Sequence, residues 1–400
     1  TSETRCSDLL KRKNIIMKPK ESILIVGTGE LGGIVLELLC RQPGNWKIVT
    51  ADANKDWGWR KTNSALMGAS YLDLYPDIEF QEINLLDVER TAELLARIDP
   101  AIIYNGTTLQ SWWVVNELPS EVNAQIYRPQ CGLGPWVAMH LALSSKLMKA
   151  VDMSGIDTHV INSSFPDATN PSLSKVGLRP CVGIGNMDLI IPYLQRSASQ
   201  ALNIPMANIE VEMIGHHYHG YNWCRNGTGY EAPHHLRIFC RGEDLTEELG
   251  DLKSFVAGLP DLNMRPAGRH GQYLVAGSSV KNIMAIFNDS NLVTHAPGPE
   301  GLEGGYPVRL NRQGAEVVLP RAMTLDQARD LMCQAQQYDG IERIEDNGDI
   351  VLTDESYEAF KELFGVDCRR VAIEDSLDQA QELRHKFEEF ARQQGVVIPY

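Results

Sequence analysis

The sequence predicts an α/β protein in which a doubly wound parallel sheet is followed by an α+β region with antiparallel strands. Over residues 21–165, short apolar segments with β-type composition alternate with segments of helical periodicity, as in the β-α-β units of parallel sheets. Beyond this region, apolar and charged residues alternate one by one, which is typical of half-exposed strands. The 400 residues therefore divide into two predicted domains, residues 21–165 and 166–400, preceded by a disordered extension over residues 1–20.

The first domain contains a regular succession of predicted elements. In chain order these are strand 23–26, helix 34–40, strand 46–50, helix 88–98, strand 101–104, helix 135–151 and strand 158–162. Residues 109–132 interrupt the order, because they are irregular and contain Trp112, Trp113 and two prolines. Long loops of this kind are often functional, although the two tryptophans are equally well explained as packing anchors.

The second domain is expected to mix helices with antiparallel strands. Its predicted elements are helix 187–202, strand 209–213, strand 236–240, a hairpin over 308–319 that turns at 311–314, and helix 376–393. Thr324 and Gln327 have the spacing of a capping box, which predicts a helix that begins after Thr324.

Composition excludes several classes of protein. The formal net charge of -15 disfavours nucleic acids and anionic membranes as partners. No apolar run is long enough for a transmembrane helix, and the polar, basic first 20 residues do not resemble a secretory signal. The eight cysteines are scattered without a C-x-x-C pair, which favours reduced thiols in a cytoplasmic protein.

A glycine-rich turn follows the first predicted strand and opens the first helix. Gly27, Gly29 and Gly32 fit the pattern G-x-G-x-x-G, and Asp52 follows Gly32 by 20 positions. In this context the pattern is typical of a Rossmann domain that binds a dinucleotide, in which the helix N-terminus faces the pyrophosphate and the acidic residue bonds the ribose. The alternative is a structural glycine turn without a cofactor.

Asp52 would repel a 2′-phosphate, so the sequence favours NAD over NADP, although Lys55, Arg60 and Lys61 lie close enough in the chain to bind that phosphate instead. The residues predicted to form the cofactor site are Gly27, Thr28, Gly29, Glu30, Leu31, Gly32, Asp52, Asn105, Gly106, Thr107 and Asn162.

Half of the ten histidines lie within 20 residues of each other, namely His216, His217, His219, His234 and His235. Histidine titrates near neutral pH and is the commonest general acid–base group. Two alternatives remain, a group of surface histidines and a metal site. The cluster lacks the helical i, i+4 spacing of common zinc motifs and no cysteine is placed to help, so we predict no metal.

Three segments together resemble the lactate/malate dehydrogenase superfamily, which also includes NAD-dependent glycosidases. They are residues 160–162 with 182–188, residues 211–217, and residues 305–310 with Gly314 and Glu316. The resemblance spans about residues 21–340. The N-terminal half is also similar to saccharopine-dehydrogenase-like and extended short-chain enzymes, but no Y-x-x-x-K pair is suitably placed for short-chain chemistry.

The resemblance implies that His217 is the catalytic acid/base and that Asp188 is the carboxylate that orients it. Two family features are missing, however. Ile191 replaces the arginine that grips the substrate carboxylate, and residues 105–127 contain no Arg or Lys. Pyruvate and oxaloacetate are therefore expected to be poor substrates. The predicted substrate contacts are Trp112, Trp113, Arg128, Asn186, His216 and His219.

The sequence thus predicts an NAD(P)-dependent oxidoreductase that moves a hydride between the nicotinamide and a hydroxyl, carbonyl or imine carbon of a small metabolite. The substrate is expected to be larger or less anionic than lactate or malate, and the protein to be a homodimer or homotetramer. One alternative is an NAD-dependent lyase or glycosidase, which Gly185 disfavours because it occupies the position of a metal-binding cysteine. Another is a dinucleotide-binding sensor without turnover.

Overall fold

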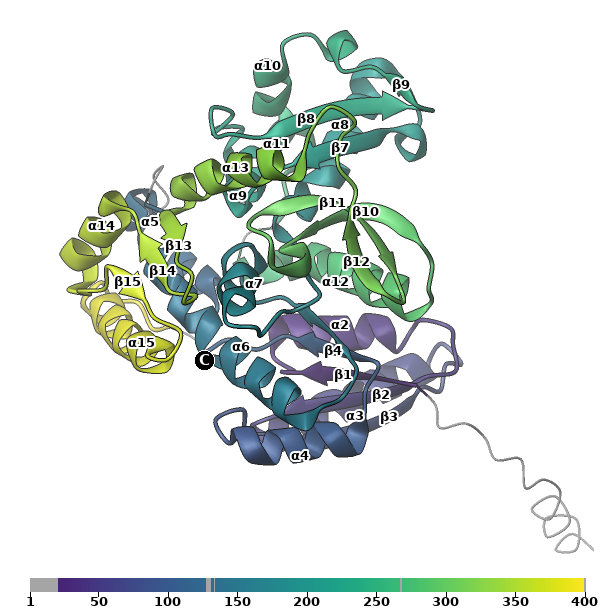
Figure 1. Cartoon of the computed structure of the whole chain (residues 1–400), viewed down its shortest axis with the longest axis vertical. Coiled ribbons are helices and arrows are strands. Elements are labelled where there is room, and N and C mark those ends of the chain that lie inside the picture. The colour runs from purple at the N-terminus through teal and green to yellow at the C-terminus, as the bar shows by residue number, and fades with distance from the viewer. Residues whose placement is uncertain (1–20, 127–130, 133, 267, 399–400) are drawn as a thin grey trace, which may run out of the picture.

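The computed structural model describes residues 21–126, 131–132, 134–266 and 268–398 (Figure 1). Its centre is a six-stranded parallel sheet with the order β3-β2-β1-β4-β5-β6, which is the Rossmann order and confirms the predicted doubly wound sheet. The strands are β1 (Ser22–Val26), β2 (Lys47–Asp52), β3 (Asp77–Glu82), β4 (Ile102–Asn105), β5 (His159–Asn162) and β6 (Val182–Gly183). The predicted extension over residues 1–20 lies outside the described residues.

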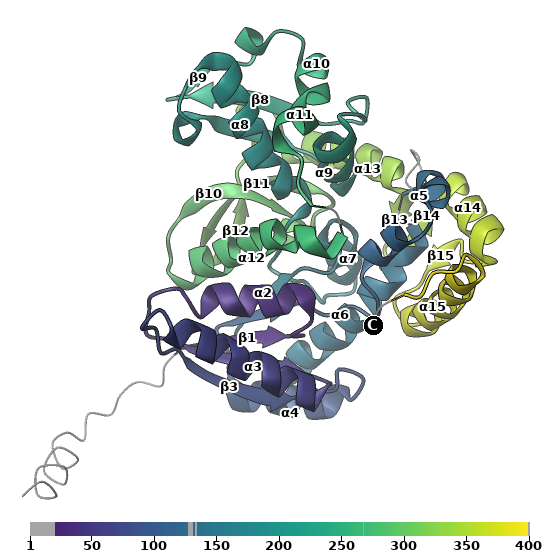
Figure 2. The same cartoon turned by 180° about the vertical axis from the view of Figure 1, so that it is seen from behind.

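The central strands are buried on both faces, which explains their continuous apolar sequence. In β1, Leu24 and Val26 belong to one core cluster, whereas Ile23 and Ile25 belong to another, because successive side chains point to opposite faces. Helices α4 and α6 cover the first face, and α2, α3 and α12 cover the second (Figures 1 and 2). The bounds of these helices are α2 (Glu30–Leu39), α3 (Lys55–Ser70), α4 (Val88–Ile98), α6 (Val137–Ser154) and α12 (Gln272–Phe287).

The second region is built on two antiparallel sheets, as predicted. One sheet contains β7 (Glu210–Ile214), β8 (His235–Cys240) and β9 (Glu243–Asp244), and the other contains β10 (Leu292–Pro297), β11 (Gly305–Asn311) and β12 (Gly314–Val317). The predicted hairpin is present, since Asn311 pairs with Gly314 at its end. The predicted capping box is also present, and Thr324 and Gln327 cap the first turn of α13 (Leu325–Ala335).

The helices that complete this region and surround the cavity described below are short. They are α5 (Ser120–Ile126), α7 (Pro166–Lys175), α8 (Ile191–Leu202), α9 (His217–Asn226), α10 (Leu252–Ala257) and α11 (Leu259–Asn263), with 3-10 turns η1 (Trp112–Glu117), η3 (Asn186–Ile190), η6 (Gly268–Gly271) and η8 (Gln336–Asp339). The loop predicted over residues 109–132 therefore contains η1 and α5. Strand β6 extends the parallel sheet beyond residue 165, where we placed the domain boundary.

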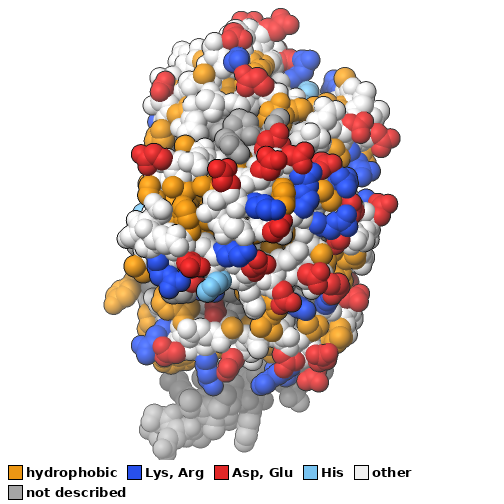
Figure 3. Space-filling model, turned by 90° about the vertical axis from the view of Figure 1, so that its left-hand side faces the viewer, with side chains coloured by type: hydrophobic (Ala, Val, Ile, Leu, Met, Phe, Trp, Pro, Cys, Tyr) orange, Lys and Arg blue, Asp and Glu red, His pale blue; other side chains and the backbone are white. Residues whose placement is uncertain are grey.

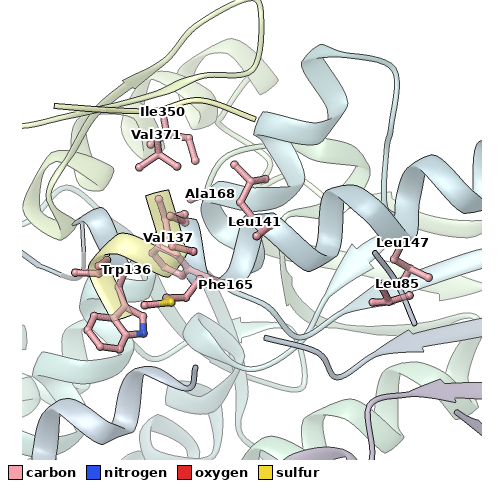
Figure 4. Close-up of a cluster of buried hydrophobic side chains, with 14 of the residues drawn as sticks. Leu85, Trp136, Val137, Leu141, Leu147, Phe165, Ala168, Ile350 and Val371 are labelled. Atoms are coloured by element: carbon pink, nitrogen blue, oxygen red, sulfur yellow. The ribbon is translucent and has the colours of Figure 1, made fainter. Parts of the chain in front are cut away.

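A third antiparallel sheet near the C-terminus was not predicted. It contains β13 (Ile341–Ile344), β14 (Ile350–Leu352) and β15 (Arg370–Val371), and α14 (Asp354–Phe364) and α15 (Ser376–Gln393) accompany it. Ile350 and Val371 of this sheet lie close to Leu141 of α6 and Ala168 of α7 (Figure 4). The C-terminal unit therefore shares one hydrophobic core with the Rossmann sheet, and it holds the preceding turn η8 against the rest of the molecule.

The surface of this side of the molecule carries acidic and basic side chains interspersed with one another (Figure 3). The excess of acidic residues is thus not gathered into one patch on the face that the figure shows. Within the described ranges, no helix is both long and apolar enough to cross a membrane.

Candidate active site

A cavity of about 970 Å³ opens at the carboxyl ends of the parallel strands β1, β2 and β4. This edge of a doubly wound sheet is where such folds bind ligands. Three groups of residues line it: the glycine-rich turn, the loop from Gly106 to Val114, and side chains of η3, α9 and the segment from Arg265 to Val275. The cavity therefore connects the predicted dinucleotide site with the predicted catalytic histidine.

The glycine-rich turn has the geometry that a dinucleotide requires. Gly27 has a φ of 89°, which other residues rarely adopt, and a Cβ on Gly32 would lie 1.9 Å from the carbonyl oxygen of Gly27. A Cβ on Gly29 would meet nothing within 4 Å, and Gly29 forms the N-cap of α2 without a side-chain hydrogen bond. The N-terminus of α2 is thus not capped by a side chain of its N-cap residue, and a pyrophosphate fits there.

Asp52 lies at the end of β2 and lines the same half of the cavity. Its Oδ2 accepts hydrogen bonds from the backbone N–H and the hydroxyl of Thr28, both at 2.7 Å. Its Oδ1 accepts from the backbone N–H of Asn54 at 2.9 Å. Asp52 thus ties the glycine-rich turn to the second strand and places a carboxylate at the wall of the cavity.

Four of the predicted cofactor residues lie behind the wall. Thr28, Gly32, Asn105 and Asn162 are buried and do not line the cavity, whereas Gly27, Gly29, Glu30, Leu31, Asp52, Gly106 and Thr107 do. Asn105 accepts hydrogen bonds from the N–H and the hydroxyl of Thr107, and it donates to Asn162 Oδ1 at 3.0 Å. The two asparagines therefore shape the loop after β4, and the prediction that they contact the cofactor directly was wrong.

His217 is the first residue of α9 and faces the cavity, with 14% of its side chain exposed. Strand β7 ends at Ile214, so the chain turns between the strand and the helix, and His217 is not part of an extended strand as we expected. Its backbone N–H donates to Asp167 Oδ1 at 3.0 Å, and its Nδ1 lies 2.7 Å from Asp339 Oδ2. Because Nδ1 is engaged with Asp339, Nε2 is the ring nitrogen left to act in the cavity.

Electrostatics favour a protonated His217. Burial lowers the pKa of its imidazole, but the charge and hydrogen bond of Asp339, together with the charge of Asp167, outweigh burial and raise the pKa above its usual value. Burial in turn raises the pKa of Asp339, but the His217 charge and the hydrogen bonds to His216 and His217 outweigh it, and the pKa is lowered. The pair is therefore an imidazolium and a carboxylate up to a pH above the usual histidine range.

The predicted partner of His217, Asp188, lies elsewhere. Both of its carboxylate oxygens are 2.7 Å from Lys281 Nζ, and one also accepts from the hydroxyl of Ser278 at 2.5 Å. Asp188 does not line the cavity. The prediction of a His217–Asp188 pair was therefore wrong, because η3 directs Asn186 towards the cavity and Asp188 towards α12.

Asp339, which replaces it, lies 122 positions after His217, at the end of η8. Nothing near His217 in the sequence indicates it, and it lies just before the unpredicted C-terminal sheet. The resemblance pointed to Asp188 because it considered only the segment before the histidine.

The two flanking histidines are structural. His216 and His219 are fully buried and neither lines the cavity, so the prediction that they contact substrate was wrong. His216 Nδ1 lies 3.4 Å from Asp339 Oδ2, and the backbone N–H of His216 donates to His219 Nδ1. Burial, together with the charge of His234, lowers the pKa of His219 to about 3. These residues fix the start of α9 and hence the position of His217.

The opposite wall of the cavity is aromatic. Trp112 and Trp113 both line it, as does Asn186, and the ring centroids of Trp112 and Tyr221 lie 6.4 Å apart at 85°. Sequence reasoning missed His140, which lines the cavity from α6. Burial and the neighbouring His217 lower the pKa of His140 to about 3, so this imidazole is neutral. Arg128, also predicted to contact substrate, lies outside the described residues.

No group of three or more potential metal ligands is assembled in the part of the chain that the structure describes. His235 instead lies 2.9 Å from Glu212, and the rings of His234 and Trp223 have centroids 4.8 Å apart. The five clustered histidines are thus distributed among separate environments.

Solved structures resemble this arrangement. Malate dehydrogenase from Plasmodium falciparum matches with a TM-score of 0.54 and 12% identity, covering 92% of this chain and 99% of its own. Minor L-lactate dehydrogenase from Enterococcus mundtii matches with a TM-score of 0.54 and 14% identity, covering 80% and 96%. The fold is that of lactate and malate dehydrogenases.

A third neighbour was solved with ligands. Lactate dehydrogenase from Cryptosporidium parvum, complexed with lactic acid and nicotinamide adenine dinucleotide, has a TM-score of 0.55 and 13% identity, covering 80% of this chain and 95% of its own. Neither a protein-family model nor a curated protein matches the sequence. At these identities the likeness concerns the fold, and function has to be argued from the site.

Proposed function

We propose that this protein is a nicotinamide-dinucleotide-dependent oxidoreductase in which His217 transfers the proton that accompanies hydride transfer. The observation that carries the proposal is the His217–Asp339 pair, which opens on the same cavity as the glycine-rich turn. A dinucleotide would be held by the turn at Gly27–Gly32 and by Asp52, with its nicotinamide supplying or accepting a hydride. Similarity in fold to the lactate dehydrogenase solved with its dinucleotide supports this use of the site.

The chain's own residues account for the proton. In the direction of carbonyl reduction, protonated His217 donates a proton from Nε2 to the substrate oxygen as the hydride reaches the carbon, which leaves an alcohol and a neutral imidazole. In the reverse direction the neutral imidazole accepts the hydroxyl proton. Asp339 holds Nδ1 in its protonated tautomer and stabilises the imidazolium, so it acts as a positioning residue. Phe165, whose ring centroid lies 5.0 Å from that of His217, excludes water from one side of the pair.

NAD is the preferred cofactor in this proposal. Asp52 is held at the cavity wall by Thr28 and Asn54, and a carboxylate there bonds a ribose diol and repels a 2′-phosphate. The nearby cations are already engaged, since Arg60 forms an ion pair with Asp56 at 2.8 Å and Lys55 lies 3.5 Å from Glu82.

The proposal is tested by incubating the protein with NAD and a panel of hydroxy acids, alcohols and amines, and by following NADH formation at 340 nm on the usual absorbance scale. Net formation of NADH that His217→Asn abolishes supports an oxidoreductase. Product formed without net NADH would instead indicate a lyase or glycosidase. Binding of NADH without any turnover would indicate a sensor, and absence of NADH binding would contradict the dinucleotide site itself.

A further inference from the structure

The end of the cavity beyond His217 is cationic. Arg225 and Arg265 line it, whereas the acidic residues among the described lining residues, Glu30 and Asp52, both lie at the dinucleotide end. Within a partly enclosed cavity, cations that face no carboxylate create a positive potential that attracts an anionic ligand.

Arg265 is the more unusual of the two arginines. It lies between α11 and η6, and its Nε and Nη1 are buried without a hydrogen-bond partner in the described structure. Its electrostatic neighbours are Tyr193, Cys224 and Arg225, and burial lowers the pKa of its guanidinium. A buried guanidinium without a partner costs several kcal/mol, on the order of the penalty for an unpaired buried charge, so a ligand anion would remove this cost.

The spacing along α9 indicates where that anion lies. His217, Tyr221 and Arg225 are four residues apart and therefore occupy one face of the helix, and all three line the cavity. At 1.5 Å per residue, Arg225 lies about 12 Å beyond His217 along the helix axis. The guanidinium of Arg225 lies over the ring of Tyr221, 5.1 Å from its centroid. The rings of Tyr221 and Trp112 form an aromatic wall between the proton donor and the cations.

We propose that Arg265 and Arg225 bind a carboxylate of the substrate that an apolar spacer separates from the reacting carbon. This inference rests on the proposed oxidoreductase function and names its substrate class, a keto or hydroxy acid with a remote carboxylate. Guanidinium groups bind carboxylates through paired, charge-assisted hydrogen bonds, and aromatic rings accommodate an apolar spacer. It also explains how the chain manages with Ile191 and with no Arg or Lys in residues 105–127.

The test compares ketones that differ in the position and charge of one group. NADH-dependent reduction is measured for pyruvate, 4-oxopentanoate and 4-acetylbenzoate, each beside its neutral amide, and for 4-acetylphenyl phosphate. The proposal predicts that kcat/KM increases along the three acids and that 4-acetylbenzoate exceeds its amide by about 100-fold, as expected for a charge-assisted pair. Equal values for acids and amides, a preference for pyruvate, or a preference for the phosphate would each overturn it.

Variants locate the effect. Arg265→Met is expected to remove the preference for the acid by raising KM, Arg265→Lys to restore part of it, and NADH affinity to stay within about twofold because the dinucleotide contacts the other end. Arg237→Met, on β8 outside the cavity, is the matched control. Weaker NADH binding with an unchanged acid preference would assign Arg265 to the cofactor and overturn the inference alone. Failure of every ketone to oxidise NADH would overturn the proposed function as well.

Discussion

Two buried aspartates, Asp188 and Asp339, show how the same side chain serves different purposes. Their side chains are 8% and 4% exposed, and each contacts one cationic group at 2.7 Å. Asp188 faces Lys281, which also donates to Thr294 and to the carbonyl of His295, so the whole group is closed off from the cavity. Asp339 faces His217, which titrates near neutral pH and opens on the cavity. The partner, and not the carboxylate, separates a structural site from a chemical one.

The largest effect should come from the member of these pairs that faces the substrate. His217→Asn is expected to lower kcat by about 10²–10⁴, the range for loss of a general acid–base group. NADH affinity, measured by fluorescence titration, should change little because the dinucleotide contacts the other half of the cavity. A near-normal kcat in this variant would assign the proton transfer to another group, and His140→Asn would then be the next variant to measure.

Asp188→Asn tests the other half of the comparison. It leaves Lys281 without its carboxylate and is expected to lower the free energy of unfolding by about 3 kcal/mol, as breaking a largely buried ion pair does. Denaturant unfolding measures this loss. The kcat of the folded fraction should stay within about threefold of wild type, since Asp188 contacts neither His217 nor the cavity. A large loss of kcat with unchanged stability would return Asp188 to the catalytic role that the family resemblance gave it.

A third aspartate, Asp52, extends the comparison to a smaller effect. Its printed partners are the neutral groups of Thr28 and Asn54, so its charge remains uncompensated at the cavity wall. NAD should bind at least about tenfold more tightly than NADP, and Asp52→Ser should narrow this ratio. Calorimetric titration of both cofactors measures it. Tighter binding of NADP by the wild-type protein would mean that Arg60 or Lys61 determines the choice.

The difference between these sites also explains what the sequence could predict. The glycine-rich turn and its aspartate lie within 26 residues, and each glycine is required by local backbone geometry, so Gly27, Gly32 and Asp52 could be located without a structure. The parallel sheet followed from apolar runs that fall on strands buried on both faces. His217 was found because a general acid–base residue follows a recognisable strand.

Residues that depend on distant contacts could not be found in this way. Asp339 reaches His217 from a turn held by the C-terminal sheet, whose strands have only two to four residues and thus little periodicity. Arg265 stands in a connection between two short elements, and its significance lies in the absence of a partner, which no sequence pattern reveals. His140 falls within a helix whose buried residues look alike in sequence. Long-range packing determined each of these positions.

The pH dependence of carbonyl reduction tests the central claim most directly. The protonated form of His217 is the proton donor, so kcat/KM should fall as pH rises through its raised pKa, above 6.5. Asp339→Asn removes the charge that favours this form and should move the fall to lower pH by about 1–3 units. Asp188→Asn should leave the profile in place. A profile that does not move in Asp339→Asn, or that moves in Asp188→Asn instead, would contradict the assignment of the His217–Asp339 pair.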